Sequence, residues 1–549
     1  MSKNTCINLL FATIFLGCTR VEPVNQIIPL YEGLSVYERK VSTESAEAQK
    51  YFNQGLTLYY GFNHEAAIKS FRQVLEYDSN CAMAWWGQAI SAGPNINNPV
   101  MDSLARASAW ETLQKAQNKI GLSDPLENAL IGALAKRYAW PAPDDRKHLD
   151  TAYAVAMKQV YGQFPDDADV GVLYADALLN LRPWDYWSPS GNPQPGTPEI
   201  VSVLEHVLSI EPDHPGACHF YIHAMEASPF PEKALPYADL LRERVPGAGH
   251  LVHMPSHIDI RLGHYQASIL ANQKAILADS TWTSQPGFYT IYIAHNHHFL
   301  AYSAMFSGQK DIAMRAANSI PVMIPMDMVN AFPDYLDAFL AIPTHVMVRF
   351  GLWEEMLSLP RPEGDIPLTR AFWHYGRTVA SSALGRIAEA SAELDSLKTA
   401  YEKVPESRLI GNNPAKIVLD IGLLVAEGEL EYRKGNYDQA FALLRDAVEK
   451  DDALRYDEPW GWMMPVRHAI GALLTEQKRF EEAISVYRKD LSLHPDNGWA
   501  LKGLADCYAL SGRHEEAAKT AKLFQEAWDF ADVPISASCY CARGKNGIQ

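Results

Sequence analysis

Apolar residues recur every three or four positions along most of the chain, and alternating runs of valine, isoleucine and threonine do not occur. That spacing places apolar side chains on one face of an α-helix, whereas a β-strand requires alternation. The pattern therefore predicts an all-α protein with almost no strand. A chain of 549 residues is too long for one ordinary core, so we expect several domains or a repeat array.

Several stretches share one pattern, in which small residues in one helix accompany an alanine and an aromatic residue in the next. These residues resemble the tetratricopeptide repeat, a 34-residue helix–turn–helix unit. The resemblance is strongest over residues 51–89, 212–279 and 478–519. It implies a tetratricopeptide-like α-solenoid with loop insertions, whose first helices line a concave groove. Most of the chain after Tyr51 also resembles a group of secreted bacterial tetratricopeptide proteins, which suggests no reaction.

Inserted loops break the period, and the proline-containing stretch 358–369 is a natural boundary between two halves. The predicted organisation is a lipoprotein signal peptide (1–18), a linker (19–44), an N-terminal solenoid with a histidine-rich concave face (45–357), a C-terminal solenoid (370–530) and a tail (531–549).

The N-terminus predicts export and a lipid anchor. The apolar run 7–16 is too short to span a bilayer and is typical of a signal peptide. Gly17 directly before Cys18 resembles a bacterial lipoprotein box, in which the cysteine is lipidated and becomes the first residue. We therefore expect a protein of the bacterial cell envelope, anchored to a membrane on its periplasmic or extracellular side. A plain secretory signal and a short membrane anchor remain alternatives.

Charge and cysteine content narrow the choice of partners. The net charge of −17 argues against nucleic acid, because phosphate binding requires a basic surface. Apart from Cys6 and Cys18, five scattered cysteines remain, which is not the pattern of a disulfide framework. Cys539 and Cys541 are spaced as a local redox or metal pair, although not as a zinc ribbon, and their role stays open.

Ten of the eighteen histidines lie between His214 and His298. His219 and His253 are 34 residues apart, as are His223 and His257, so each pair occupies equivalent positions in adjacent repeats. Glu226 follows His223 by three residues, which stacks it on the same helical face. Pro255 must either kink the second helix or begin it.

Further histidines keep this register relative to the turn that ends the first helix. His253, His298 and His468 each lie ten residues before it. The predicted metal ligands are His219, His223, Glu226, His250, His253, His257, His295 and His298, and the second-tier candidates are His345, Glu458 and His468.

Two functions remain open. Imidazoles with one carboxylate suit copper, iron or zinc rather than calcium or magnesium. The first function is therefore a transition-metal protein with a small organic substrate or peptide in the groove, and hydrolase and oxidoreductase are both open as its class. The second is a non-catalytic adaptor that binds a peptide or protein partner, as most tetratricopeptide arrays do. Metal analysis of the purified protein separates the two.

Overall fold

The computed structural model describes residues 28–34, 36–280 and 287–542. Nearly all regular structure in this part of the chain is helical, which confirms the all-α prediction. The described strands are the two-residue segments β1 (Leu409–Ile410) and β2 (Asn413–Pro414), which pair antiparallel. No helix of the described residues is long and apolar enough to cross a membrane.

Helices of the N-terminal half stack as successive antiparallel pairs. They are α1 (Ala46–Tyr60), α2 (His64–Tyr77), α3 (Ala82–Ser91), α4 (Ser103–Gln117), α5 (Pro125–Leu134), α6 (Lys147–Gln163), α7 (Ala168–Leu179), α8 (Thr197–Ile210), α9 (Pro215–Met225), η1 (Pro231–Ala234), α10 (Leu235–Arg244), α11 (Gly249–His253), α12 (Pro255–Leu262) and α13 (Tyr265–Asp279).

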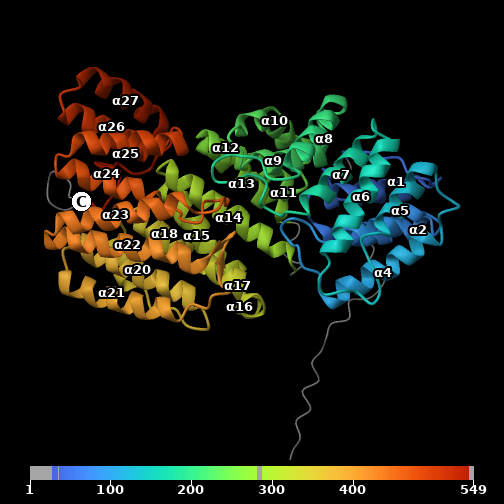
Figure 1. Ribbon diagram of the computed structural model, residues 1–549, viewed down its shortest axis with the longest axis horizontal. Helices are drawn as coiled ribbons and strands as arrows, with labels where there is room; N and C mark the ends of the chain where they lie inside the picture. The colour runs from blue at the N-terminus through green and yellow to red at the C-terminus, as the bar shows by residue number, and fades with distance from the viewer. Residues whose placement is uncertain (1–27, 35, 281–286, 543–549) are drawn as a thin grey trace, which may run out of the picture.

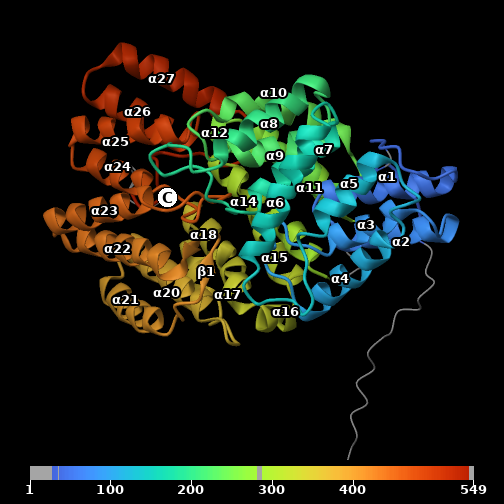
Figure 2. The ribbon, with the colours of Figure 1, turned by 45° about the vertical axis from the view of Figure 1, so that its right-hand side comes forward.

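The middle of the chain joins this half to the next. Its helices are α14 (Tyr289–Phe306), α15 (Lys310–Met323), α16 (Met326–Ala331), α17 (Pro333–Leu336), η2 (Asp337–Ala341), α18 (Ile342–Arg349) and α19 (Trp353–Ser358). The C-terminal half holds α20 (Pro367–Ala383), α21 (Ile387–Glu402), α22 (Ala415–Lys434), α23 (Tyr437–Asp452), α24 (Val466–Glu476), α25 (Phe480–Leu493), α26 (Gly498–Leu510) and α27 (His514–Ala527). Figures 1 and 2 both show α20–α27 stacked in chain order, with α14–α18 between them and the N-terminal helices.

Glycines account for the close packing of the best-formed hairpins. An added Cβ at Gly55 or Gly87 would lie 2.8 or 2.6 Å from the nearest ring atom of Phe71. Near the other end of the chain, a Cβ at Gly471 or Gly503 would lie 2.6 or 2.2 Å from Tyr487. In both places one aromatic ring on a second helix fits between glycines of the two flanking first helices. The same device 416 residues apart explains why these stretches carry the clearest repeat pattern.

The predicted linker and tail are parts of the packed structure over their described residues, which differs from expectation. Leu34 and Tyr37 are buried, and the Arg39 guanidinium binds the carboxylates of Asp167 and Asp169 at 3.0 and 2.7 Å. At the other end, Cys541 is buried in the core of the C-terminal half. Both segments cover apolar surface of the solenoid, a role that their composition does not reveal.

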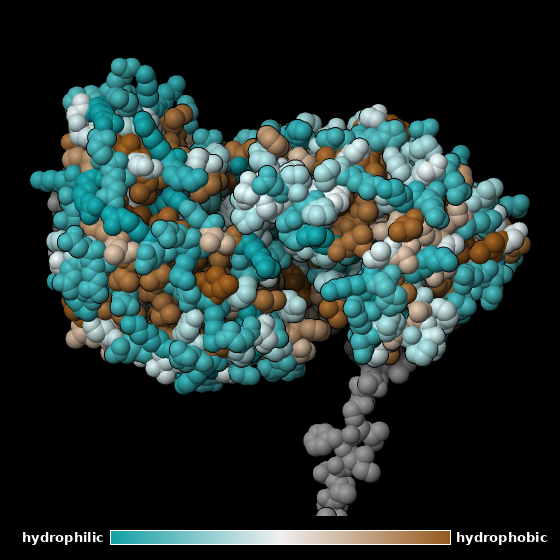
Figure 3. Space-filling model, in the orientation of Figure 1, coloured by the Kyte–Doolittle hydropathy of each residue, from teal (hydrophilic) through white to brown (hydrophobic). Residues whose placement is uncertain are grey.

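Packing also continues across the predicted boundary at 358–369. Ala341 and Val348, which precede it, belong to the same buried cluster as the C-terminal helices. The space-filling view shows a largely hydrophilic face with scattered hydrophobic patches and a recess between the two halves (Figure 3).

Candidate metal centre

Six histidines from four helices meet in two groups of three. The first triad is His219 and His223 of α9 with His250 of α11. The second triad is His253, the last residue of α11, with His257 of α12 and His295 of α14. Within each triad, one nitrogen of every ring lies within 4.8 Å of the others. Each triad thus contains two histidines four residues apart in the sequence, whereas the repeat-matched partners His219/His253 and His223/His257 are divided between the triads.

Pro255 interrupts the helix without separating the second triad. α11 ends at His253 and α12 begins at Pro255, while Met254 between them keeps helical angles (φ −50°, ψ −38°). The backbone N–H of His257 donates to the carbonyl of Met254 at 3.1 Å. The chain thus continues in a helical direction, and residues four apart still share a face.

Acceptors fix the tautomer of two rings. His219 Nδ1 lies 2.6 Å from the backbone carbonyl of Tyr60. His253 Nδ1 lies 2.7 Å from Oδ1 of Asn272, whose amide donates to the Ser268 carbonyl at 2.8 Å and so is held in that orientation. A carbonyl oxygen only accepts, so both rings carry their hydrogen on Nδ1 and present a lone pair at Nε2.

Glu226 orients two more rings, one from each triad. Its Oε1 lies 2.8 Å from His223 Nδ1, and its Oε2 lies 2.6 Å from His257 Nδ1. Glu458, from the loop before α24, adds a second carboxylate oxygen 3.0 Å from His257 Nδ1. When Glu226 is ionised it only accepts, so both Nδ1 atoms that face it carry hydrogen and Nε2 of His223 and His257 is also left with its lone pair.

These four lone pairs point into the cluster. Nε2 of His253 and His257 are 2.7 Å apart, and Nε2 of His219 lies 3.2 Å from Nε2 of His250. His223 Nε2 is buried and has no hydrogen-bond partner among the described residues. Two lone pairs that face each other at 2.7 Å repel unless a positive charge lies between them.

The distances between the Nε2 atoms are close to those of imidazole ligands around one transition-metal ion. Tetrahedral coordination with metal–nitrogen bonds of 2.0–2.1 Å places ligand nitrogens roughly 3.3 Å apart. The His219–His250 separation of 3.2 Å already matches this value. The His253–His257 pair would need to open by about half an ångström. Nδ1–H donated to a carbonyl or carboxylate is also the usual arrangement behind a metal-bound imidazole.

Electrostatics disfavour a proton as the positive charge. Burial, and then in most cases the neighbouring imidazoles, lowers the pKa of His219, His223, His250, His253 and His295. Burial and the adjacent Glu458 raise the pKa of Glu226 well above its ordinary value, against the opposing charge of Arg261. A cation held by the Nε2 atoms would keep this carboxyl group ionised.

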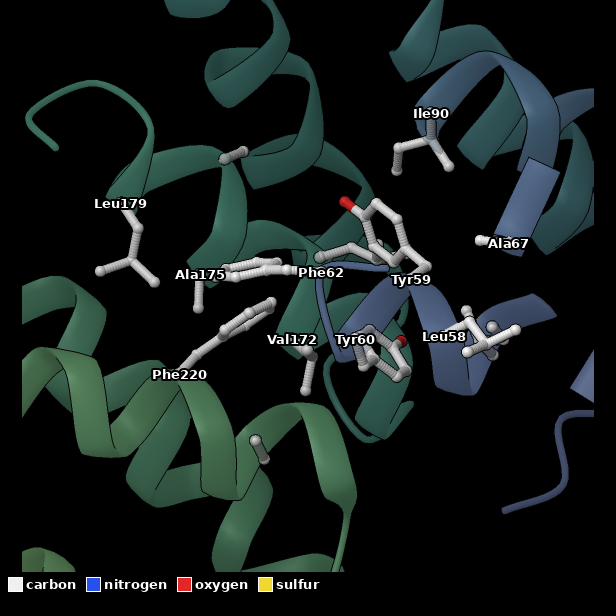
Figure 4. Packing of buried hydrophobic residues seen from close by; sticks show 14 of the residues in the cluster. Leu58, Tyr59, Tyr60, Phe62, Ala67, Ile90, Val172, Ala175, Leu179 and Phe220 are labelled. Carbon is white, nitrogen blue, oxygen red and sulfur yellow. The ribbon is translucent and has the colours of Figure 1, made fainter. Parts of the chain in front are cut away.

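An aromatic shell encloses the cluster. Phe62 packs on the first triad, with ring centroids 4.6 Å from His219 and 5.5 Å from His250. Phe299 packs 4.8 Å from His253, and Trp184 meets His223 at 5.2 Å. Figure 4 shows Phe62 beside Phe220 of α9, next to the buried residues of α1 and α7. The groove expected to be open is therefore filled here by side chains and loops.

Exposure differs within the cluster. Five of the six histidines are at most 1% exposed, while His295 is only partly buried.

Five predicted residues lie outside both triads: Glu226 and Glu458, which contact rings of the triads, and His298, His345 and His468. His298 is three residues further along α14 than His295 and packs against Phe339 of η2. His345 of α18 packs on Phe372, and His468 of α24 binds the Asp490 carboxylate at 2.9 Å. Cys18, the predicted lipidation site, lies outside the described residues.

The sequence did not single out the acceptors behind His219 and His253. Asn272 belongs to the second helix of a hairpin, and the Tyr60 contact is a backbone carbonyl. The asparagine has no distinguishing neighbours, and a carbonyl carries no sequence signal. Glu458 was a second-tier candidate and does reach the cluster from 201 residues beyond His257.

Comparisons with known proteins support the repeats and the fold class. Sequence models of the tetratricopeptide repeat match residues 48–81 and 474–525, well under half of the chain. No curated protein matches in a sequence search. The described helices and these matches define an all-α, tetratricopeptide-like solenoid.

Solved structures resemble it only loosely. The human IFIT1 dimer with PPP-AAAA is 12% identical, with 88% of this chain and 91% of that chain covered and a TM-score of 0.32. The APC/C hetero-tetramer Cut9-Hcn1 is 13% identical, with coverages of 90% and 76% and a TM-score of 0.30. Yeast Tom70 is 12% identical, with coverages of 88% and 93% and a TM-score of 0.28. At these scores the likenesses carry no argument about function.

Proposed function

We propose that this solenoid is a metalloprotein that binds one or two transition-metal ions between α9, α11, α12 and α14. The observation that carries the proposal is the convergence of Nε2 lone pairs on rings whose Nδ1 hydrogens are donated elsewhere. His253 and His257 are the clearest case, because their Nε2 atoms face each other at 2.7 Å. An ordinary hydrogen-bonded histidine ladder would place a donor opposite each acceptor.

Each triad supplies three ligands and leaves coordination positions open. Glu226 then acts as a positioning residue for His223 and His257, because it contacts their Nδ1 atoms. Imidazole ligands favour copper, iron or zinc. An open position on such an ion activates a water molecule or handles oxygen, so hydrolysis and oxidation both remain candidate reactions for a small organic substrate or peptide.

Elemental analysis of the full-length protein after repletion with zinc, copper(II) or iron(II) tests the proposal. We expect one or two equivalents of one metal in the parent and the same amount in His468→Ala. That variant is a matched control because His468 is a buried histidine outside both triads. A folded parent that retains no metal under any of these conditions contradicts the proposal.

A protein-interaction adaptor is the second candidate, and the repeat matches favour it. Tetratricopeptide arrays generally bind partners on the surface that their stacked helices create. In that case the histidine cluster would be a packing feature of the core, and metal would not change the stability of the protein. Fold alone does not decide between the two, because function resides in the site.

Membrane attachment through a lipid on Cys18 is a further part of the proposal, with the chain in the bacterial cell envelope. Two acyl chains or more anchor a protein stably, whereas one does so only marginally. Cys18→Ser should therefore release the protein into the soluble fraction. Retention of this variant in washed membranes would contradict lipid anchoring through Cys18.

A further inference from the structure

The C-terminal tail brings a disulfide against a buried carboxyl group, far along the chain from the histidine cluster. Cys539 and Cys541 are joined. Glu429 lies on α22, and one of its carboxylate oxygens is within 4.8 Å of both sulfur atoms. Neither the metal proposal nor the repeat architecture uses this group of residues.

Hydrogen bonds fix the register of the tail. Ser538 donates to the backbone carbonyl of His468 at 2.7 Å, and its hydroxyl lies 2.6 Å from that of Tyr487. The Arg433 guanidinium donates to the carbonyl of Cys541. The disulfide is therefore held in one place on the solenoid.

Its two sulfurs differ in access. Cys541 is 1% exposed, whereas Cys539 is only partly buried and lines a small cavity with Trp462 and Val466. An incoming thiolate can therefore reach Cys539, and Cys541 is the buried leaving group. A disulfide stabilises a fold by restricting the unfolded chain, and this effect is smallest when the bond closes a loop of one intervening residue. Reduction of this disulfide therefore costs the fold little stability.

Glu429 is suited to move a proton at this bond. Its side chain is buried, and Oε2 has no hydrogen-bond partner among the described residues. Burial raises the pKa of Glu429 to about 7, against the opposing charge of Arg433 on the same helix. Other titratable groups around the cavity are Tyr375 of α20, Arg349 of α18 and His468 of α24.

We infer that Cys539–Cys541 is a reactive disulfide that exchanges with dithiols, with Glu429 carrying the proton of the leaving thiolate. A thiolate of the dithiol attacks Cys539 Sγ, the S–S bond breaks, and its electron pair passes to Cys541 Sγ, which takes the Glu429 proton. The second thiolate of the dithiol then attacks its own mixed-disulfide sulfur and displaces Cys539 as a thiolate, which solvent protonates. The dithiol is oxidised to a disulfide by two electrons, and the protein pair is reduced to two thiols.

The remaining described cysteines are not suited to this exchange. Burial raises the pKa of Cys81 and Cys218 to about 12 and that of Cys507 to about 11. Thiols of this kind are unreactive because the thiolate is the nucleophile. They also serve as an internal reference in a thiol count.

The test is the rate at which dithiothreitol reduces the oxidised full-length protein, followed by alkylation and mass spectrometry. At pH 6, where Glu429 is protonated, we expect the parent to react about tenfold faster than Glu429→Gln. The ratio should approach one at pH 8.5. Glu431→Gln is the matched control, because that carboxylate lies on the same helix and pairs with Lys434; it should behave as the parent.

Equal rates for the parent and Glu429→Gln at pH 6 would overturn the inference, as would a pair that resists reduction while the protein stays folded. If the circular dichroism spectrum shows that Glu429→Gln is unfolded, the pH profile of the parent protein tests the inference instead. Its rate per unit of dithiothreitol thiolate should bend near pH 7, and a flat profile would overturn the role of Glu429.

Discussion

Two regions of this molecule bury histidines at the same repeat position, yet surround them with different partners. His253 and His468 each lie ten residues before the turn that ends their first helix, and both are buried. His468 Nε2 meets the carboxylate of Asp490 at 2.9 Å. His253 Nε2 meets only another imidazole nitrogen at 2.7 Å, because an amide oxygen already occupies its Nδ1.

The repeat position therefore sets where a histidine points, and the neighbouring helix sets what it does. Asp490 of α25 gives His468 an acceptor for its Nε2–H, so that this nitrogen has a protein partner. In the N-terminal half the acceptors lie at Nδ1 of four of the six rings, and the Nε2 lone pairs of those rings face the cluster. Four predictions test this contrast, in order of decreasing effect.

Removing one ligand from each triad should abolish metal binding. We expect His219→Ala with His253→Ala to lower the affinity by more than about 100-fold, beyond the loss typical of a partner behind a ligand. His468→Ala should bind metal as the parent does. Measurement of the bound metal per chain also counts the ions, because two independent ions would leave one equivalent in each single variant. Metal retained by the double variant would contradict the site.

Asp490→Asn should have the opposite profile, with unchanged metal content and reduced stability. Asp490 accepts hydrogen bonds from His468 and Asn497, both at 2.9 Å. Loss of these two charge-assisted bonds should lower the free energy of unfolding by ~3 kcal/mol at pH 7. Denaturant titration measures the difference, and an unchanged midpoint would show that the pair is not stabilising.

The contribution of Asp490 to the free energy of unfolding should depend on pH. Burial raises the pKa of Asp490, but the His468 ring and the hydrogen bonds lower it further, so the net shift is below 3.8. A lowered pKa in the folded state gives stability that is complete above about pH 4 and is lost as the pH falls below that value. The difference in the free energy of unfolding between the parent and Asp490→Asn should therefore become smaller as the pH falls below about 4.

Metal should stabilise the parent and leave the double triad variant unaffected. At a hundredfold excess over the dissociation constant, binding to the folded state alone contributes ~2.7 kcal/mol. A chelator should therefore lower the melting temperature of the loaded parent and not that of the variant. Identical melting curves for the parent with and without chelator, under conditions shown to strip metal, would reject the site.

Glu226→Gln should give the smallest effect, a loss of affinity of about 10–100-fold. The amide can accept from one of His223 and His257, but its NH₂ group faces the other Nδ1 and forces that ring into the wrong tautomer. Isothermal titration with the preferred metal measures the loss. An affinity equal to that of the parent would show that Glu226 does not orient the rings.

Much of the fold could be predicted from periodicity alone, because helical spacing and the glycine–aromatic contacts are local or repeated. The histidine register was informative for the same reason, and it brought α9 together with α11 and α12. The same register included His298, whose ring packs against Phe339 of η2 and lies outside both triads. Asn272 carried no sequence signal, and the contact of the second-tier candidate Glu458 with His257 could not be derived, since both positions depend on how separate hairpins pack.

The contact between Glu458 and His257 has a consequence for the order in which the histidine cluster is completed during folding. It closes a loop of about 200 residues, and the entropic cost of such closure is met only after both ends have formed. Contacts this distant in sequence form slowly and late. The contact of Glu458 with His257 thus exists only in a chain whose two halves have docked, whereas both triads are formed within residues 219–295.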